Sequence, residues 1–139
     1  MIKNISNLGD AAVYCDFGIE VNKSINSNVI KYFNSIKEKK FKGINNLTPS
    51  YNKLIISYDL KLTNFNEVKS YVESINVTDS ITSVSKKIEI PVCCHEMFSM
   101  DIKRVEEKLN LSREKILDNF LNKEYFCYMT GFIAGMPFL

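Results

Sequence analysis

The succession of strand-like and helix-like segments in the first half of the chain constrains its fold most strongly. Residues 11–17 form an apolar strand segment, and residues 22–40 carry apolar side chains at helical spacing. Residues 44–48 and 53–58 flank a Pro-Ser-Tyr-Asn turn and predict a β-hairpin. Because hairpin-linked strands pair antiparallel, we expect an α+β fold, a small antiparallel sheet with two helices on one face.

Two helices and two further strands complete this expectation. The helix over 22–40 has one apolar stripe, and Gly43 is its expected stop signal. A second helix opens at the capping sequence Asn64-x-x-Glu67. A short apolar start and the segment 87–92 read as further strands, which gives the order strand, strand, helix, strand, strand, helix, strand.

The second half of the chain has a different pattern of apolar residues. After a polar stretch at 78–85, apolar residues between 98 and 109 recur at helical spacing, and Ser112 can cap a second short helix. Two short helices joined by a brief turn predict a helical hairpin. We therefore expect two domains, an N-terminal α+β domain over 1–85 and a second domain that starts in 86–139.

The C-terminal segment Tyr125–Leu139 contains the strongest functional candidate. It begins as an aromatic strand and continues into a loop with Gly131, Gly135 and Pro137. Glycine allows another group to lie against the main chain, because no Cβ is in the way. A tight turn leading to another strand explains the same residues, and the two interpretations are compatible. Gly131, Gly135 and Pro137 are thus the substrate-binding candidates, and the catalytic residues stay unknown.

The cluster Cys93-Cys94-His95-Glu96 is the one run of metal-type ligands in the sequence. Adjacent cysteines point to opposite sides of an extended chain, and a structural zinc site needs a second pair of ligands. A Cys–His nucleophile pair lacks an orienting third group. We therefore expect no metal here and interpret the cluster as packing at the end of a strand.

Composition narrows the class of protein further. A formal net charge of +2 is too small to indicate nucleic-acid binding. The longest uncharged apolar segment is shorter than the roughly 20 residues that a membrane-spanning helix needs. Cysteines without an export signal are typical of reduced thiols, so we expect a cytoplasmic protein without a membrane partner.

With these segments described, the chain resembles the allophanate hydrolase subunit 1 family. Four stretches carry the resemblance in order along the chain. They are the Gly-Asp strand within 8–18, the Pro-x-Tyr hairpin within 43–59, the Ile-Pro-Val-Cys stretch at 90–93 followed by Asp101, and the glycine-rich terminal segment 125–139.

The resemblance implies a component like the B-type subunit of an ATP-dependent 5-oxoprolinase, which converts 5-oxoproline to glutamate. It implies a subunit 2 (C-type) partner and a third subunit, with ATP used by the complete complex and no cofactor bound by this chain. It also implies that the second domain is a cyclophilin-like, carboxyltransferase-type β-barrel. A KipI-like regulatory module that binds a sensor histidine kinase is an alternative, and so is one half of a split or degraded allophanate hydrolase or urea carboxylase-type subunit.

Departures from the family pattern affect the same region. Phe120 stands where the family has a histidine, and Ala134 stands where it has a proline. The sequence also ends where the barrel would begin, so we expect a chain truncated after the start of the second domain and inactive in isolation. An uncharged aromatic terminus further predicts pairing with an edge strand of this or a neighbouring molecule, and self-association through residues 125–139.

Overall fold

The computed structural model describes residues 1–77 and 86–139. Contacts divide the chain into two compact units, Met1–Ser83 with Cys127–Leu139 and Val84–Phe126. The polar stretch at 78–85 and the domain boundary expected at residue 85 lie outside the described residues, and that boundary stays a prediction.

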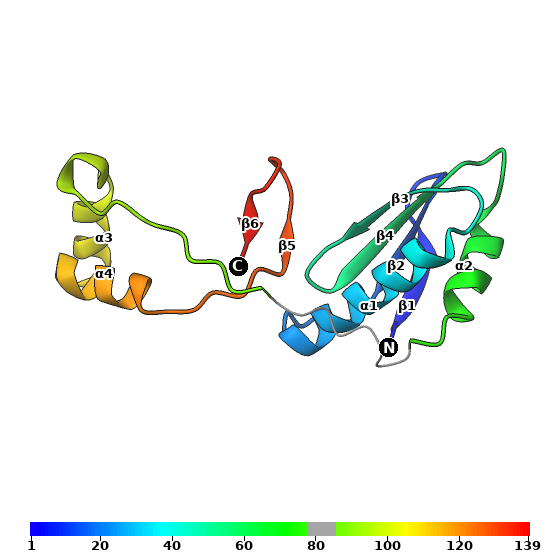
Figure 1. The fold of residues 1–139 in the computed structure, drawn as a ribbon, viewed down its shortest axis with the longest axis horizontal. Helices are drawn as coiled ribbons and strands as arrows, with labels where there is room; N and C mark the ends of the chain where they lie inside the picture. Colours follow the sequence, from blue (N-terminus) through cyan, green and yellow to red (C-terminus); the bar gives the residue numbers. More distant parts are fainter. Residues whose placement is uncertain (78–85) are drawn as a thin grey trace. The chain divides into compact units, whose positions relative to one another are not determined.

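An antiparallel sheet forms the centre of the first unit (Figure 1). Its strand order is β1-β2-β4-β3, so the two middle strands come from different hairpins. The bounds are β1 Asn4–Asn7, β2 Ala12–Asp16, β3 Ile44–Pro49 and β4 Lys53–Tyr58. The sheet confirms the hairpin predicted around residues 49–52 and the antiparallel layering.

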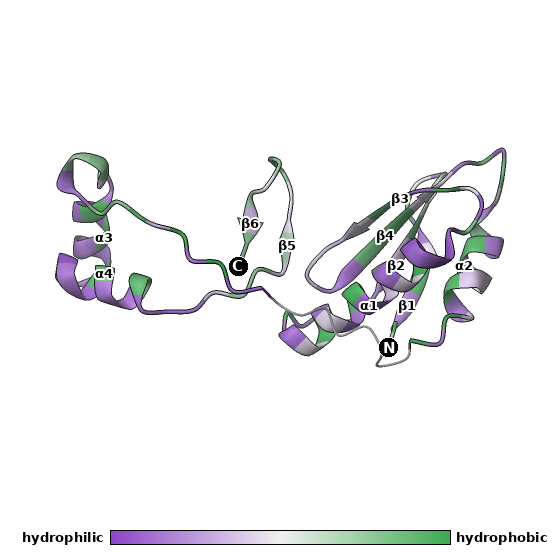
Figure 2. Ribbon diagram, viewed as in Figure 1, coloured by the Kyte–Doolittle hydropathy of each residue, from purple (hydrophilic) through white to green (hydrophobic). Residues whose placement is uncertain are grey.

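The hydrophobic core lies on one face of this sheet. Val13 pairs with Ile56 and Cys15 with Leu54, and these side chains are all fully buried. Alternate residues of a strand point to opposite faces, so these directly opposed pairs form one apolar surface. The apolar colour of β4 in Figure 2 follows from this pattern.

Two helices cover that surface, as the sequence predicts. Helix α1 spans Lys23–Lys39 and helix α2 spans Phe65–Glu73, and both contribute valines to the same buried cluster. The Asn64 side chain accepts a hydrogen bond from the Glu67 N–H at 3.1 Å, which confirms the predicted cap. Gly43 does not end α1. The helix ends earlier because the backbone of Lys40 is left-handed, with φ +46°. The prediction that Gly43 ends the helix was therefore wrong.

The second unit is a helical hairpin, also as expected. It contains the short 3-10 helix η1 (Glu96–Phe98), α3 (Ile102–Leu109) and α4 (Arg113–Leu121). The Ser112 hydroxyl accepts a hydrogen bond from the Lys115 N–H and caps α4. None of the described residues of this unit is buried, so its apolar side chains form a seam rather than a core.

One strand prediction was wrong, and the terminal strand was confirmed in part. Residues 87–92 have no strand partner among the described residues and are irregular backbone, with Ile88 and Ile90 largely exposed. A strand is stabilised by its neighbour, so an apolar sequence without one does not form a ladder. The terminal segment is strand only at β5 (Met129–Thr130), which pairs with β6 (Pro137–Phe138), as the interpretation of a tight turn leading to another strand expects. It does not pair with an edge of the large sheet, and pairing with a neighbouring molecule stays a prediction.

Among the described residues, no helix has the length and apolar character needed to cross a membrane.

Candidate functional site

The glycine loop predicted from the sequence is the tip of the β5–β6 hairpin. The Tyr128 N–H donates to the Phe138 carbonyl at 2.9 Å, and the Gly131 N–H donates to the Met136 carbonyl at 3.1 Å. Pro137 lies opposite Thr130 at the first position of β6. Proline has no N–H to give to a ladder, so the start of a short strand is a position where it costs little. The structure thus places Gly131, Gly135 and Pro137 in one small hairpin.

The backbone of the tip is sharply bent. The Ile133 N–H donates to the Gly131 carbonyl at 2.7 Å and closes a tight turn around Phe132, whose φ is +61°. A bulky residue adopts such a φ only at a cost of about 1–3 kcal/mol. Gly135 has φ +84°, where glycine carries no such cost.

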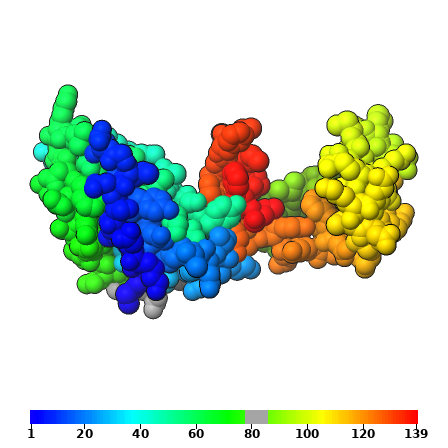
Figure 3. All heavy atoms as spheres, turned by 180° about the vertical axis from the view of Figure 1, so that it is seen from behind, coloured from blue at the N-terminus to red at the C-terminus, as the bar shows by residue number. Residues whose placement is uncertain are grey.

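Apolar side chains surround this bend, and the hairpin is drawn in orange and red in Figure 3. Phe132 is 92% exposed and Ile133 is 63% exposed. The tip is green in Figure 2, and the segment 125–139 has no charged side chain. An uncharged apolar tip in water fits contact with another molecule.

The tip also offers backbone donors. Within the part of the chain that the structure describes, the N–H groups of Phe132, Ala134 and Gly135 form no hydrogen bond. A Cβ placed on Gly135 would meet no atom within 4 Å. Neighbouring backbone N–H groups in a bend that includes a left-handed residue can bind an anion. The loop therefore has backbone donors without a protein partner among the described residues, beside open space.

The base of the hairpin packs against the turn between β3 and β4. The Tyr51 ring lies 5.5 Å from the Tyr128 ring and 6.4 Å from the Phe138 ring, measured between centroids. The Ser50 hydroxyl lies 3.3 Å from the Met129 sulfur. Tyr51, expected from its turn position to be exposed, is half-buried in this aromatic cluster.

A buried amide in α1 joins the same elements. The Asn26 Nδ2 lies 3.1 Å from the Ser50 carbonyl, 3.0 Å from the Tyr51 carbonyl and 3.2 Å from the Tyr128 carbonyl. Sequence reasoning missed Asn26, although a signal exists. Asn26, Val29, Phe33 and Ile36 recur at helical spacing, so a polar residue stands on the apolar face of the helix. A polar side chain at such a position needs a specific partner.

A second polar group holds the other side of the turn. The Asn52 amide donates to the carbonyls of Gly18 and Glu20, at 2.9 and 3.0 Å. Lys53 forms an ion pair with Asp16, and its hydrogen bond lowers the pKa of Asp16 below the ordinary value. These contacts fix the loop after β2 against the same turn.

The Cys93-Cys94-His95-Glu96 cluster takes part in local structure. The His95 Nδ1 accepts a hydrogen bond from the Met97 N–H at 3.2 Å and caps η1. The Arg113 guanidinium donates to the Cys94 carbonyl and to the Glu96 carboxylate. No group of three or more metal-type ligands gathers within residues 1–77 and 86–139. The packing expected at a strand end does not occur, because no strand forms there.

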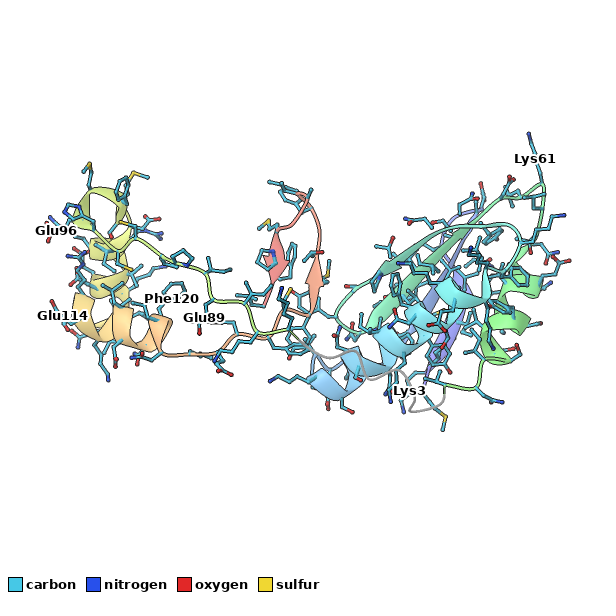
Figure 4. The ribbon with its side chains drawn as sticks, in the orientation of Figure 1. Lys3, Lys61, Glu89, Glu96, Glu114 and Phe120 are labelled. Atoms are coloured by element: carbon cyan, nitrogen blue, oxygen red, sulfur yellow. The ribbon has the colours of Figure 1, made fainter. Side chains whose placement is uncertain are left out.

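Phe120 lies in the last turn of α4, where it is labelled in Figure 4. Its ring is 5.9 Å from the Tyr125 ring, and the Tyr125 hydroxyl donates to the Phe120 carbonyl at 3.2 Å. This position therefore packs on the segment that leads toward the hairpin.

A known family matches nearly the whole chain. The model described as "Carboxyltransferase domain, subdomain C and D" matches residues 3–139. In a search of characterised proteins, the B-type subunit of 5-oxoprolinase from Bacillus subtilis (strain 168) is 32% identical over 97% of this chain. The chain spans 61% of the length of that relative.

Two solved structures are also similar to this chain. A conserved uncharacterized protein from Pyrococcus horikoshii is 29% identical, with a TM-score of 0.51, and the match covers 94% of this chain and 60% of the other. The protein TTHA0988 has a TM-score of 0.71 at 21% identity, over 87% of this chain and 24% of the other, which shows the fold alone.

Proposed function

Because the chain belongs to the family of carboxyltransferase domains, subdomains C and D, we propose that it acts as the B-type component of an ATP-dependent 5-oxoprolinase. The observation that carries the proposal is the 32% identity with the B-type subunit of a 5-oxoprolinase across 97% of the chain. The proposal includes a division of labour. This chain acts with a subunit 2 (C-type) partner and a third subunit, and it has no activity alone.

The hairpin tip supplies the chemistry that supports this proposal. 5-Oxoproline carries a carboxylate and a lactam carbonyl, and both are hydrogen-bond acceptors. The unpaired N–H groups at Phe132, Ala134 and Gly135 are donors, and the space beside Gly135 is open. In the proposal, Gly131, Gly135 and Pro137 shape a loop that contacts the substrate through its main chain, and they have no catalytic role.

ATP has a separate place in the proposal. We assign ATP to the complete complex and no cofactor to this chain, as the resemblance to the family implies.

Reconstitution tests the proposal directly. The chain is co-expressed with the subunit 2 and third-subunit partners from one source, and 5-oxoproline-dependent ATP hydrolysis is measured with and without this chain. We expect turnover only with the full set. The absence of turnover with every partner present and stably associated would contradict the enzyme role.

A matched pair of glycine variants tests the role of the tip. Gly135→Ala and Gly9→Ala both place a methyl group at a positive φ in open space, at +84° and +62° respectively. Only Gly135 lies in the β5–β6 hairpin, because Gly9 lies between β1 and β2. In the proposal, the added Cβ occupies the open space beside the loop and keeps the substrate away from the main chain, so Gly135→Ala should raise the KM for 5-oxoproline by about tenfold, which corresponds to about 1.4 kcal/mol. Gly9→Ala should leave the KM unchanged. An equal rise in KM in both variants would contradict a substrate contact at the loop.

The proteins that co-purify with the tagged chain separate the alternatives. A subunit 2 partner supports the oxoprolinase role. A sensor histidine kinase would indicate the KipI-like regulatory role, and a C-terminal fragment of the same family would indicate a split subunit.

A further inference from the structure

We infer that Asn26 is a positioning residue, whose side-chain amide holds the base of the β5–β6 hairpin against the β3–β4 turn and so fixes where the glycine tip is presented. The physical inference stands on the geometry of the first unit. Its relevance to substrate binding rests on the proposed function.

The first argument is the chemistry of the Asn26 amide. Its terminal nitrogen has three carbonyl oxygens within 3.2 Å, those of Ser50, Tyr51 and Tyr128. An oxygen at that place would face three other acceptors, so the amide orientation is fixed by its surroundings. The amide has two N–H groups for these acceptors, and one N–H must be shared.

The second argument is burial. Asn26 is 3% exposed, although its neighbours along α1 belong to an apolar stripe. Removing the amide takes away a buried donor that the carbonyl groups of Ser50, Tyr51 and Tyr128 share, and the loss of such a hydrogen bond is costly. Loss of the amide therefore weakens the contacts of three carbonyl groups, and one of them, the Tyr128 carbonyl, belongs to the base of the hairpin.

The third argument is the way in which the hairpin is attached. β5 and β6 form their own sheet and share no backbone ladder with β1–β4. Side-chain contacts join the hairpin to the rest of the first unit, among them the Asn26 amide, the Ser50 hydroxyl on the Met129 sulfur, and the Tyr51 ring on two aromatic rings. Asn26 is the member of this group that binds the hairpin and the turn with one atom. The position of the tip is therefore coupled to the first turn of α1.

Methionine methyl NMR provides a readout at the base of the hairpin. The chain has methionines at 1, 97, 100, 129 and 136. Met129 contacts Ser50, whereas Met97 and Met100 belong to the other compact unit and are 72% and 94% exposed. The full chain is labelled with 13C-methyl methionine, and the spectra of Asn26→Leu, Asn26→Ser and Asn52→Leu are compared with the wild type.

Asn52→Leu is the matched control. Asn52 is also buried and also donates to two carbonyls of the same region, those of Gly18 and Glu20, but it does not reach the hairpin. A general loss of stability would affect both asparagine variants alike, whereas release of the hairpin would affect only one.

In folded Asn26→Leu and Asn26→Ser, the Met129 methyl signal should narrow and move to the position of the exposed Met100 signal. In Asn52→Leu it should stay in place, and Met97 and Met100 should stay in place throughout. If Asn26→Leu fails to fold, Asn26→Ser decides, because serine suits the first turn of a helix but is too short to reach the carbonyls. An unmoved Met129 signal, or an equal shift in Asn52→Leu, overturns the inference. This readout needs no partner or substrate, so its failure is distinct from failure of the proposed function.

Discussion

The side-chain nitrogen of Asn26 lies 3.2 Å from the carbonyl oxygen of Tyr128, 102 residues further along the chain. This contact joins the first turn of α1 to the foot of the glycine hairpin. The same nitrogen reaches the turn at Ser50 and Tyr51, so three segments distant in sequence meet at one buried atom. The loop that the sequence singles out is therefore held by a residue that the sequence analysis did not select.

Gly43→Ala should be strongly destabilising. Gly43 has φ +95°, and a Cβ there would lie 2.8 Å from Thr63 Cγ2 and 3.1 Å from Leu62 Cβ. Backbone strain of about 1–2 kcal/mol and overpacking of about 1–3 kcal/mol add up. We expect chemical denaturation to show a loss of about 2–5 kcal/mol in the free energy of unfolding. Gly9→Ala introduces backbone strain without overpacking, so its free energy of unfolding should fall by only about 1 kcal/mol. Equal losses in the two variants would contradict overpacking at Gly43.

The Asp16–Lys53 ion pair should make stability depend on pH. The hydrogen bond from Lys53 lowers the pKa of Asp16 in the folded state, so the unfolded chain binds the proton more readily. The contribution is then fully present above about pH 4 and is lost as the pH falls through the lower pKa of the folded state. Both side chains are partly exposed, so it should not exceed about 1 kcal/mol. Denaturation curves of the wild type and Asp16→Asn should differ at pH 6 and converge in acid. A constant difference would argue against the linkage.

The cysteines should differ sharply in reactivity. Cys15 is fully buried, and burial raises its pKa to about 12, so its thiolate is scarce at neutral pH. Cys93 and Cys127 are exposed. Pulse labelling with a thiol reagent at pH 7.5, followed by mass spectrometry, should modify Cys93 and Cys127 first. Cys15 should react only after denaturant is added, and rapid labelling of Cys15 in the folded protein would contradict its place in the core.

The apolar tip should promote self-association through residues 125–139. Phe132 and Ile133 are largely exposed, and burying each in a contact would contribute roughly 1.5–3 kcal/mol. Sedimentation velocity of the isolated chain should show association that rises with concentration, and the double variant Phe132→Ser, Ile133→Ser should be monomeric. Neither residue belongs to the core, so thermal unfolding of the double variant provides the control and should be unchanged. A wild type that stays monomeric at high concentration would contradict the prediction.

Local patterns predicted the elements with strong local causes. Helix α1 was placed within one residue at each end, because Asn22 caps it and its apolar residues recur at helical spacing. The β3–β4 hairpin and the Ser112 cap were confirmed for similar reasons. Such features depend on residues a few positions apart, and the energy that decides them is present within the segment itself.

The segment 87–92 shows where this reasoning ends. Its alternating apolar residues suit a strand, but no neighbouring strand lies beside it among the described residues. Residues 125–127 also lie outside any strand, and pairing begins where the Tyr128 N–H donates to the Phe138 carbonyl, next to β5 and β6. Strand propensity describes how well a segment suits a sheet, whereas the hydrogen bonds that stabilise the strand come from a partner elsewhere in the chain.

The sequence alone determined the α+β layering, the helical hairpin and the family, because periodicity, caps and ordered motifs are properties of the linear chain. Only the tertiary structure decided that Tyr51 is covered by Tyr128 and that Asn26 contacts the base of the terminal hairpin. Each of these depends on which buried polar and aromatic groups meet across many tens of residues. Those meetings are selected by the packing of the whole unit, and no segment encodes them by itself.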